Sequence, residues 1–153
     1  MFSQQVQEYW KKFCKTTGSD PTSDYDAWGF GDSKSMSDEL ADLVIAGEKT
    51  TTAGSVLEHE INNWKLAKEG DYVVILDGNQ LPKCVIQYTK VQRMKFHEME
   101  DVKFAKDEGE GFETLELWRS AHKGYFTRVL EGLGKQFSED MEIICSRFAV
   151  VYT

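Results

Sequence analysis

The chain has 153 residues, of which 41% are hydrophobic and 12% aromatic, so it can bury a core; disorder and disulfide-stapled miniproteins are excluded. Its net charge of −8 has the wrong sign for holding long nucleic acid by counterion release. Without an 18-residue apolar run, a secretory signal or a CxxC pair among its three cysteines, it is expected to be soluble, without a membrane span, and cytoplasmic.

Two helices are predicted in the first third of the chain, with a structured loop between them. Apolar residues recur at helical spacing over 3–15, so one face of this helix should pack on a core. The stretch GSDPTSDYDAWGFGDS predicts a loop that carries three large aromatic rings. Ser35 or Ser37 can cap the next helix, and Gly47 stands where a helix commonly ends.

The remainder of the chain mixes strands and helices. Residues 49–53 predict a strand, and a helical pattern follows that Gly70 terminates. YVVIL, a DGNQ turn and LPKCVIQYTKVQRMKF predict a hairpin, the clearest β signal in the chain. Helices are predicted over 97–106 and 114–130, and IICSRFAVVYT predicts a closing strand. This order favours a single α+β domain over 1–153 with a small mixed sheet or barrel, on which the helix in residues 1–18 packs.

No familiar cofactor or hydrolase motif is present. His59, His97 and His122 lack the close spacing of a preassembled metal-ligand set, so no metal site is predicted. The sequence GFGD lacks the Lys-Ser/Thr of a phosphate-binding loop and the strand-to-helix setting of a dinucleotide fingerprint. There is no Gly-x-Ser-x-Gly elbow. The sequence therefore predicts no cofactor.

The junction AGEKTTTAG places a lysine directly before three threonines, residue types that can take part in catalysis. In an extended strand Lys49 and Thr51 would share a face and Thr52 would point to the other, whereas an irregular turn could bring Lys49 and Thr52 together. A strand start with a solvated lysine is the ordinary alternative.

Gly47-x-Lys49-x-x-Thr52 resembles the G-x-K-x-x-T signature of the ASCH family, whose members share a PUA-like β-barrel surrounded by helices. DAWGFGDS and FAKDEGEGFETLELWRSAHKGYF resemble the larger bacterial ASCH-domain proteins, and the likeness spans about 25–152. One departure is Gly54, where the family signature often has an arginine that could contact a phosphate or carboxylate. The resemblance implies a PUA-like mixed β-barrel with peripheral helices.

The resemblance also implies an RNA- or nucleoside-binding protein. Small members with this motif are amidohydrolases that act on cytidine acetylated at its exocyclic amine, using a Lys, a Thr and a Glu. Carried over to this chain, these catalytic residues are Lys49, Thr52 and Glu108. Two alternatives stay open: the metal-dependent ribonuclease described for larger members, which would use a divalent metal and again Lys49, and a non-catalytic RNA- or nucleotide-binding module. The expected partner is a modified nucleoside or short single-stranded RNA.

Six further residues are candidates for substrate binding. Aromatic rings can stack on a flat base, a contact of roughly 1–3 kcal/mol per base, and cations can hold a phosphate. The candidates are Tyr25, Trp28, Phe30, Trp118, Arg119 and His122. For each ring, packing in the core is the alternative role.

Overall fold

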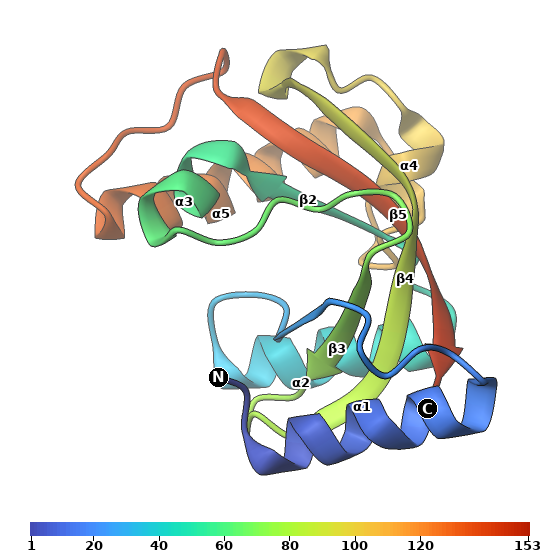
Figure 1. The fold of residues 1–153 in the computed structure, drawn as a ribbon. Coiled ribbons are helices and arrows are strands. Elements are labelled where there is room, and N and C mark those ends of the chain that lie inside the picture. Colours follow the sequence, from blue (N-terminus) through green and yellow to red (C-terminus); the bar gives the residue numbers. More distant parts are fainter. The chain divides into compact units, whose positions relative to one another are not determined.

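The structure is a computed structural model that describes all 153 residues. Five strands form one mixed sheet in the order β1-β3-β4-β5-β2, with β1 and β2 at its two ends (Figure 1). The strands are β1 (Tyr25–Trp28), β2 (Thr51–Ser55), β3 (Tyr72–Leu76), β4 (Pro82–Lys95) and β5 (Glu142–Tyr152). The helices are α1 (Gln4–Thr17), α2 (Lys34–Ile45), α3 (Val56–Asn62), the short 3-10 helix η1 (Phe96–Glu98), α4 (Val102–Lys106) and α5 (Leu115–Gly132). The predicted α+β class is confirmed; the sheet is open, so the term barrel describes it only roughly.

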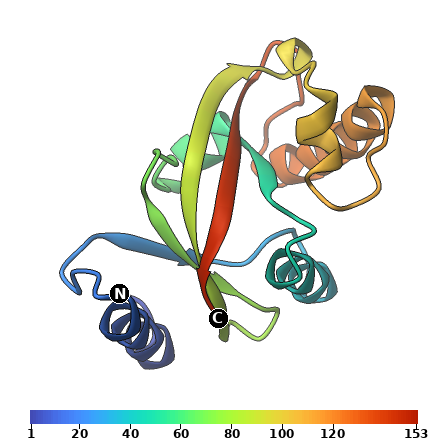
Figure 2. The ribbon, with the colours of Figure 1, turned by 90° about the vertical axis from the view of Figure 1, so that its right-hand side faces the viewer.

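The chain divides into two compact units. The first comprises Met1–Glu48, Glu69–Thr89 and Phe148–Thr153, and the second Lys49–Lys68 and Lys90–Arg147. The long strands β4 and β5, which run alongside each other in Figures 1 and 2, contribute residues to both units. Assignment of the whole chain as one domain stays a prediction.

In the first unit, α1 packs on β3 and β4. Ser3 caps the helix by accepting a hydrogen bond from the Val6 N–H, and Gly18 ends it in the left-handed conformation with φ 75°. The buried side chains shared by these elements are Val6, Trp10, Phe13, Cys14, Val74, Leu76 and Val85. The prediction that one face of the first helix packs on a core is confirmed.

The predicted loop after α1 contains a strand instead. Residues Tyr25–Trp28 form β1, which pairs parallel with β3 so that Tyr25 lies opposite Tyr72 and Trp28 opposite Ile75. This pairing joins segments far apart in sequence, and four residues with one Asp and one Ala carry no alternating pattern to announce it.

The predicted hairpin is confirmed by the antiparallel pairing of β3 with β4. Its turn is held by the Asp77 carboxylate, which accepts hydrogen bonds from the backbone N–H groups of Asn79 and Leu81. The Gly78 N–H donates to the carboxylate of Asp38 at 2.7 Å, which ties the turn to α2.

In the second unit, β2 pairs antiparallel with β5, and α4 and α5 contribute to an aromatic core. Thr114 caps α5 by accepting from the Leu117 N–H, and Trp118 and Phe126 of this helix are fully buried. Phe96 stacks on Trp118 with ring centroids 5.6 Å apart. Phe104 and Ala105, which precede Glu108, belong to this core, and Phe112, which follows it, packs against the core.

Three helix boundaries differ from the predictions. The predicted helix over 97–106 is two elements, because the chain is extended at Met99 and Asp101 then caps α4 with its own carboxylate. Helix α3 ends well before Gly70, because Asn63 adopts the left-handed conformation with φ 55°. The cap of α2 is Ser33. Gly47 does end this helix segment, with φ 77°.

Candidate functional site

A backbone hydrogen bond brings the predicted catalytic segments together. The Thr50 N–H, just before β2, donates to the carbonyl of Asp107 at the end of α4, at 2.8 Å. The Thr51 hydroxyl donates to the carbonyl of Phe104, also in α4, at 2.9 Å. Lys49 and Glu108 are the chain neighbours of the first pair, so they are held near each other.

Lys49 lies between two carboxylates. Its Nζ is 3.9 Å from Glu108 Oε1 and 3.2 Å from Glu110 Oε2. The side chains of Lys49 and Glu108 are each 2% exposed, and that of Glu110 is 25% exposed. A solvated lysine and a solvated acidic loop, the ordinary alternatives at these two positions, therefore do not apply to Lys49 and Glu108. Glu110 had no predicted role, although it shares a loop with Glu108.

The buried Glu108 also meets His122 of α5. The imidazole Nε2 is 2.9 Å from Glu108 Oε2 and 3.3 Å from Oε1. The other ring nitrogen, Nδ1, is 2.8 Å from the Trp118 carbonyl one helical turn earlier. Both nitrogens of His122 thus face protein groups, and Glu108 is the charged one of the two.

Thr52 lies on β2, partly buried, opposite Ser146 of β5. Since side chains alternate along a strand, Thr52 points to the face opposite Thr51, whose hydroxyl is fully buried and bonded to α4. Thr52 is therefore the more accessible of these two hydroxyls.

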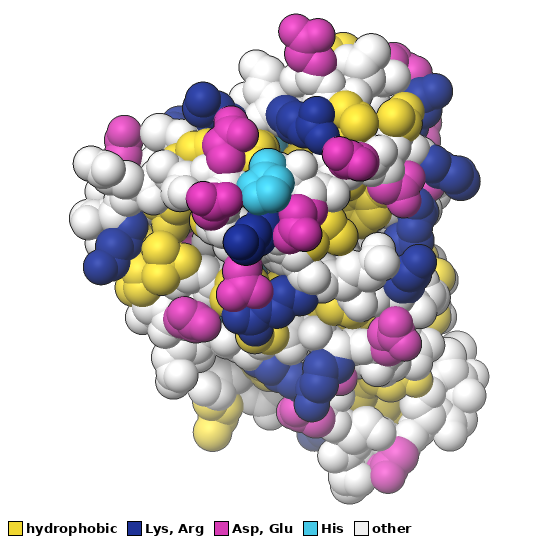
Figure 3. Space-filling view, turned by 90° about the horizontal axis from the view of Figure 1, so that it is seen from above, with side chains coloured by type: hydrophobic (Ala, Val, Ile, Leu, Met, Phe, Trp, Pro, Cys, Tyr) yellow, Lys and Arg dark blue, Asp and Glu magenta, His cyan; other side chains and the backbone are white.

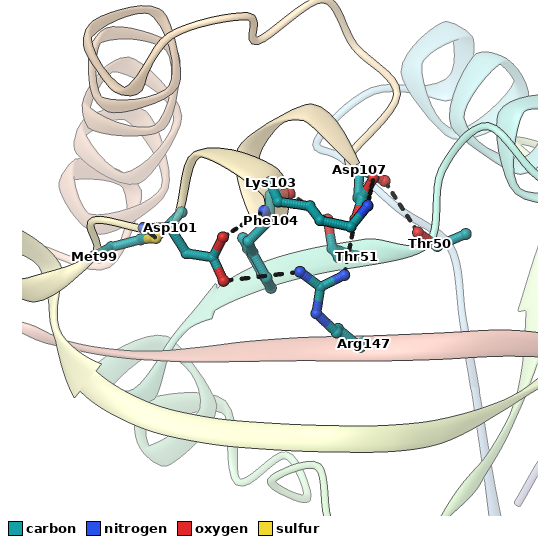
Figure 4. Close-up of polar contacts among 8 residues, drawn as sticks. All are labelled: Thr50, Thr51, Met99, Asp101, Lys103, Phe104, Asp107 and Arg147. Carbon is teal, nitrogen blue, oxygen red and sulfur yellow. Dashed lines mark hydrogen bonds and ion pairs between the residues drawn. The ribbon is translucent and has the colours of Figure 1, made fainter.

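Arg147, for which the sequence predicts no role, holds the segment from Asp101 to Asp107 in place (Figure 4). Arg147 of β5 donates to Asp107 Oδ2 at 2.8 Å, reaches within 3.8 Å of Asp101, and lies over the Phe104 ring. Partial burial acts to raise the pKa of Asp107, but hydrogen bonds from Arg147 and Lys103 outweigh it and lower that pKa below its ordinary value. No local pattern marks Arg147, because its partners are far away in sequence.

The aromatic candidates Tyr25, Trp28 and Phe30 belong to the first unit. Tyr25 is stacked on Trp10 with ring centroids 4.3 Å apart, and Phe30, which is buried, meets Trp28 edge to face at 4.8 Å. These contacts are those of core packing. A role for the three rings in substrate binding stays a prediction.

The other two candidates lie on α5. Trp118 is fully buried between Phe96 and His122, and its indole N–H has no hydrogen-bond acceptor. Arg119 donates to the carbonyl of Met99 at 2.8 Å. Both contacts support the fold of the second unit, and contact of either residue with a substrate stays a prediction.

A family model described as the ASCH domain matches residues 26–152. The chain belongs to the ASCH domain family. The residues matched include Lys49, Thr52, Glu108 and His122. Among proteins with curated descriptions, none matches this ASCH domain.

Solved structures agree with this assignment. A protein from Enterococcus faecalis V583 is 34% identical, with 97% of this chain and 89% of that chain covered and a TM-score of 0.87. An ASCH domain from Lactobacillus crispatus JV V101 is 25% identical, with 99% and 97% covered and a TM-score of 0.87. A third, a hypothetical protein that is 14% identical, shares the fold with a TM-score of 0.54 over 83% of this chain and 99% of that chain.

The ASCH domain carries no ready-made metal centre: nowhere do three or more His, Cys, Asp or Glu side chains gather in a way that could hold a metal ion. None of its helices is long and apolar enough to span a membrane. Acidic and basic side chains are interspersed on the face shown in Figure 3, without a continuous basic field.

Proposed function

We propose that this ASCH domain binds a modified nucleoside or a short single-stranded RNA and hydrolyses an amide on the base, as in cytidine acetylated at its exocyclic amine. The ASCH family is generally RNA-binding. The net charge of −8 favours a small ligand over long RNA. The observation that carries the proposal is the buried contact of Lys49 with Glu108, with Nζ and Oε1 3.9 Å apart.

Each of the three residues has a chemical role in the proposal. The Thr52 hydroxyl attacks the acyl carbon and forms an acyl ester. Glu108 takes the hydroxyl proton and passes it to the leaving amine. Lys49 stabilises the negative charge that develops on the acyl oxygen.

Lys49 serves better as a cation than as a base. A lysine must be neutral to accept a proton, and two carboxylates within 4 Å favour its ammonium form. A base role would require burial to outweigh both of these attractions. An acyl oxygen could take the place of Glu110, the more exposed of the two carboxylates, on the ammonium group.

The test is a turnover assay on a panel of modified nucleosides and short RNAs, with and without a chelator. We expect Lys49→Ala, Glu108→Gln and Thr52→Ala each to lose about 10²–10⁴-fold in turnover of acetylated cytidine, and Thr52→Ser to retain part of it. The matched controls Lys103→Ala, Glu113→Gln and Thr50→Ala change exposed or partly buried residues of the same types and should stay near wild type.

Other outcomes identify the alternatives. Full activity of Lys49→Ala would refute the catalytic roles. RNA cleavage that a chelator abolishes would identify the metal-dependent ribonuclease. Binding of nucleoside or RNA that survives in Thr52→Ala, with no turnover by wild type of any substrate, would identify a binding module. For location we propose the cytoplasm, because all three cysteines are free thiols.

A further inference from the structure

His122 has a hydrogen-bond pattern that restricts its protonation. A carbonyl oxygen can only accept, so the Trp118 carbonyl at 2.8 Å requires a proton on Nδ1. A neutral imidazole with its proton on Nδ1 has a lone pair on Nε2. Here that lone pair would point at the oxygens of Glu108, 2.9 and 3.3 Å away, in a buried setting. A second proton, on Nε2, turns this repulsion into a charge-assisted hydrogen bond to Oε1, with Oε2 also close to the charged ring.

The charges around the pair favour the same state. Facing Glu108 are Lys49 and His122, and Glu110 faces Lys49. Cys145 of β5 is close to Glu108, but burial, assisted by the charge of Glu108, raises the pKa of this thiol to about 12, so it stays neutral. Glu110 is more exposed than the other groups, so the buried charge that His122 meets directly is that of Glu108. A buried carboxylate is costly unless cations pair with it, and the rings of Phe112, Trp118 and Phe126 around His122 bring no charge that could do so.

We propose that His122 is a positioning residue, protonated on both ring nitrogens, that holds Glu108 as an ionised and oriented carboxylate. Helix α5 fixes the ring through the Trp118 carbonyl and through stacking on Trp118, with centroids 4.1 Å apart. The role of this arrangement in hydrolysis rests on the proposed function. The protonation itself is a property of the protein without substrate.

In the hydrolysis Glu108 accepts one proton and gives it back in each of two steps. As the Thr52 oxygen bonds to the acyl carbon, its proton moves to Glu108; as the carbon–nitrogen bond breaks, its electron pair stays on the nitrogen, which takes that proton. Water then adds to the acyl carbon and gives a proton to Glu108, which returns it to the departing Thr52 oxygen as the free acid forms. His122 keeps both of its protons throughout.

The test is nitrogen NMR of the histidine rings in the full chain, labelled with ¹⁵N-histidine. The chain has three histidines, and His59→Asn and His97→Asn assign the signals. His59 is the matched control, because its Nδ1 is also bonded to a carbonyl one turn earlier, that of Ser55 at 2.7 Å, but no carboxylate faces its ring. Imidazole ordinarily loses its second proton near about pH 6.5. At about pH 8 we expect both nitrogens of His122 to be protonated and His59 to carry one proton, on Nδ1.

A variant separates the contribution of Glu108. In Glu108→Gln we expect His122 to lose the Nε2 proton and to give ring-nitrogen signals like those of His59, whereas Glu113→Gln, a change at an exposed carboxylate, leaves His122 as in wild type. A neutral His122 at about pH 8 in wild type, or an unchanged His122 in Glu108→Gln, would overturn the proposal. The wild-type measurement decides even if Glu108→Gln does not fold. A doubly protonated His122 in a protein without amidase activity would leave the positioning contact standing and refute only the proposed function.

Discussion

The N–H of Thr50 and the carbonyl of Asp107 form the hydrogen bond next to which Lys49 and Glu108 lie. Arg147 binds the Asp107 side chain at 2.8 Å, so one aspartate joins the start of β2, the end of α4 and strand β5 (Figure 4). The distance between Lys49 and Glu108 therefore depends on groups that do not themselves contact either side chain.

The first prediction concerns pH. The pKa of Asp107 is lowered in the folded protein, so its interactions add stability above the unfolded value of about 3.9, and this stability is lost as pH falls through the folded pKa. Asp107→Asn should lower the free energy of unfolding near neutral pH by about 1 kcal/mol and lose less of it on acidification than wild type. Urea unfolding at several pH values measures both; parallel pH curves for the two proteins would contradict the prediction.

A second prediction follows from the burial of Lys49. Lys49→Met leaves Glu108 buried without this cation, which should cost about 3–5 kcal/mol in the free energy of unfolding. Adding Glu108→Gln to that variant should recover at least about 1 kcal/mol, because one of the two carboxylates that Lys49 had balanced is then neutral. Urea unfolding measures the three proteins. Lys103→Met is the control, because this lysine is 78% exposed and should matter by less than about 0.5 kcal/mol. Equal effects of the two lysine variants would argue against a buried ion pair.

A third prediction contrasts two glycines. A Cβ at Gly78 would collide with the backbone carbonyl of Lys34, so Gly78→Ala should destabilise by about 1–3 kcal/mol. Gly124 lies inside α5, where a Cβ would meet only the end of Arg128 at 3.8 Å, and Gly124→Ala should stabilise by about 0.5–1 kcal/mol. Thermal unfolding of both variants checks the opposite signs. Destabilisation by Gly124→Ala would show that this glycine has a further role.

The fourth prediction concerns the cysteines. Burial raises the pKa of Cys84 and of Cys145 to about 12 and also raises that of Cys14, so all three remain protonated thiols at ordinary pH. Iodoacetamide at about pH 8 should leave the folded protein unmodified, and urea should expose all three thiols to alkylation. Mass spectrometry counts the adducts. Rapid labelling of any one cysteine in the native protein would reveal local opening around it.

Elements with a strong local signal were predictable from sequence. The hairpin of β3 and β4 follows from two runs rich in strand-forming residues on either side of a DGNQ turn, and α1 from its apolar spacing. Strand β1 was missed because its stability comes from pairing with β3, and the break before α4 because the cap at Asp101 was overlooked.

The candidate site was predictable only in part, and mostly from family resemblance. That resemblance pointed to Lys49 and Glu108, which the structure brings within 3.9 Å. The interactions of Asp107 with Arg147 and of Glu108 with His122 depend on how β5 and α5 pack in the folded second unit. No spacing in the sequence encodes such contacts, because they join segments far apart in the chain.

The adjacency of Lys49 and Thr50 in the chain has a consequence for chain length. Thr50 is bonded to Asp107, the residue before Glu108, so no residue separates either member of the buried ion pair from this hydrogen bond. Inserting one residue between Lys49 and Thr50 would move the lysine out of register with its two acids. The number of residues at this point is therefore as much a part of the site as the identity of its side chains.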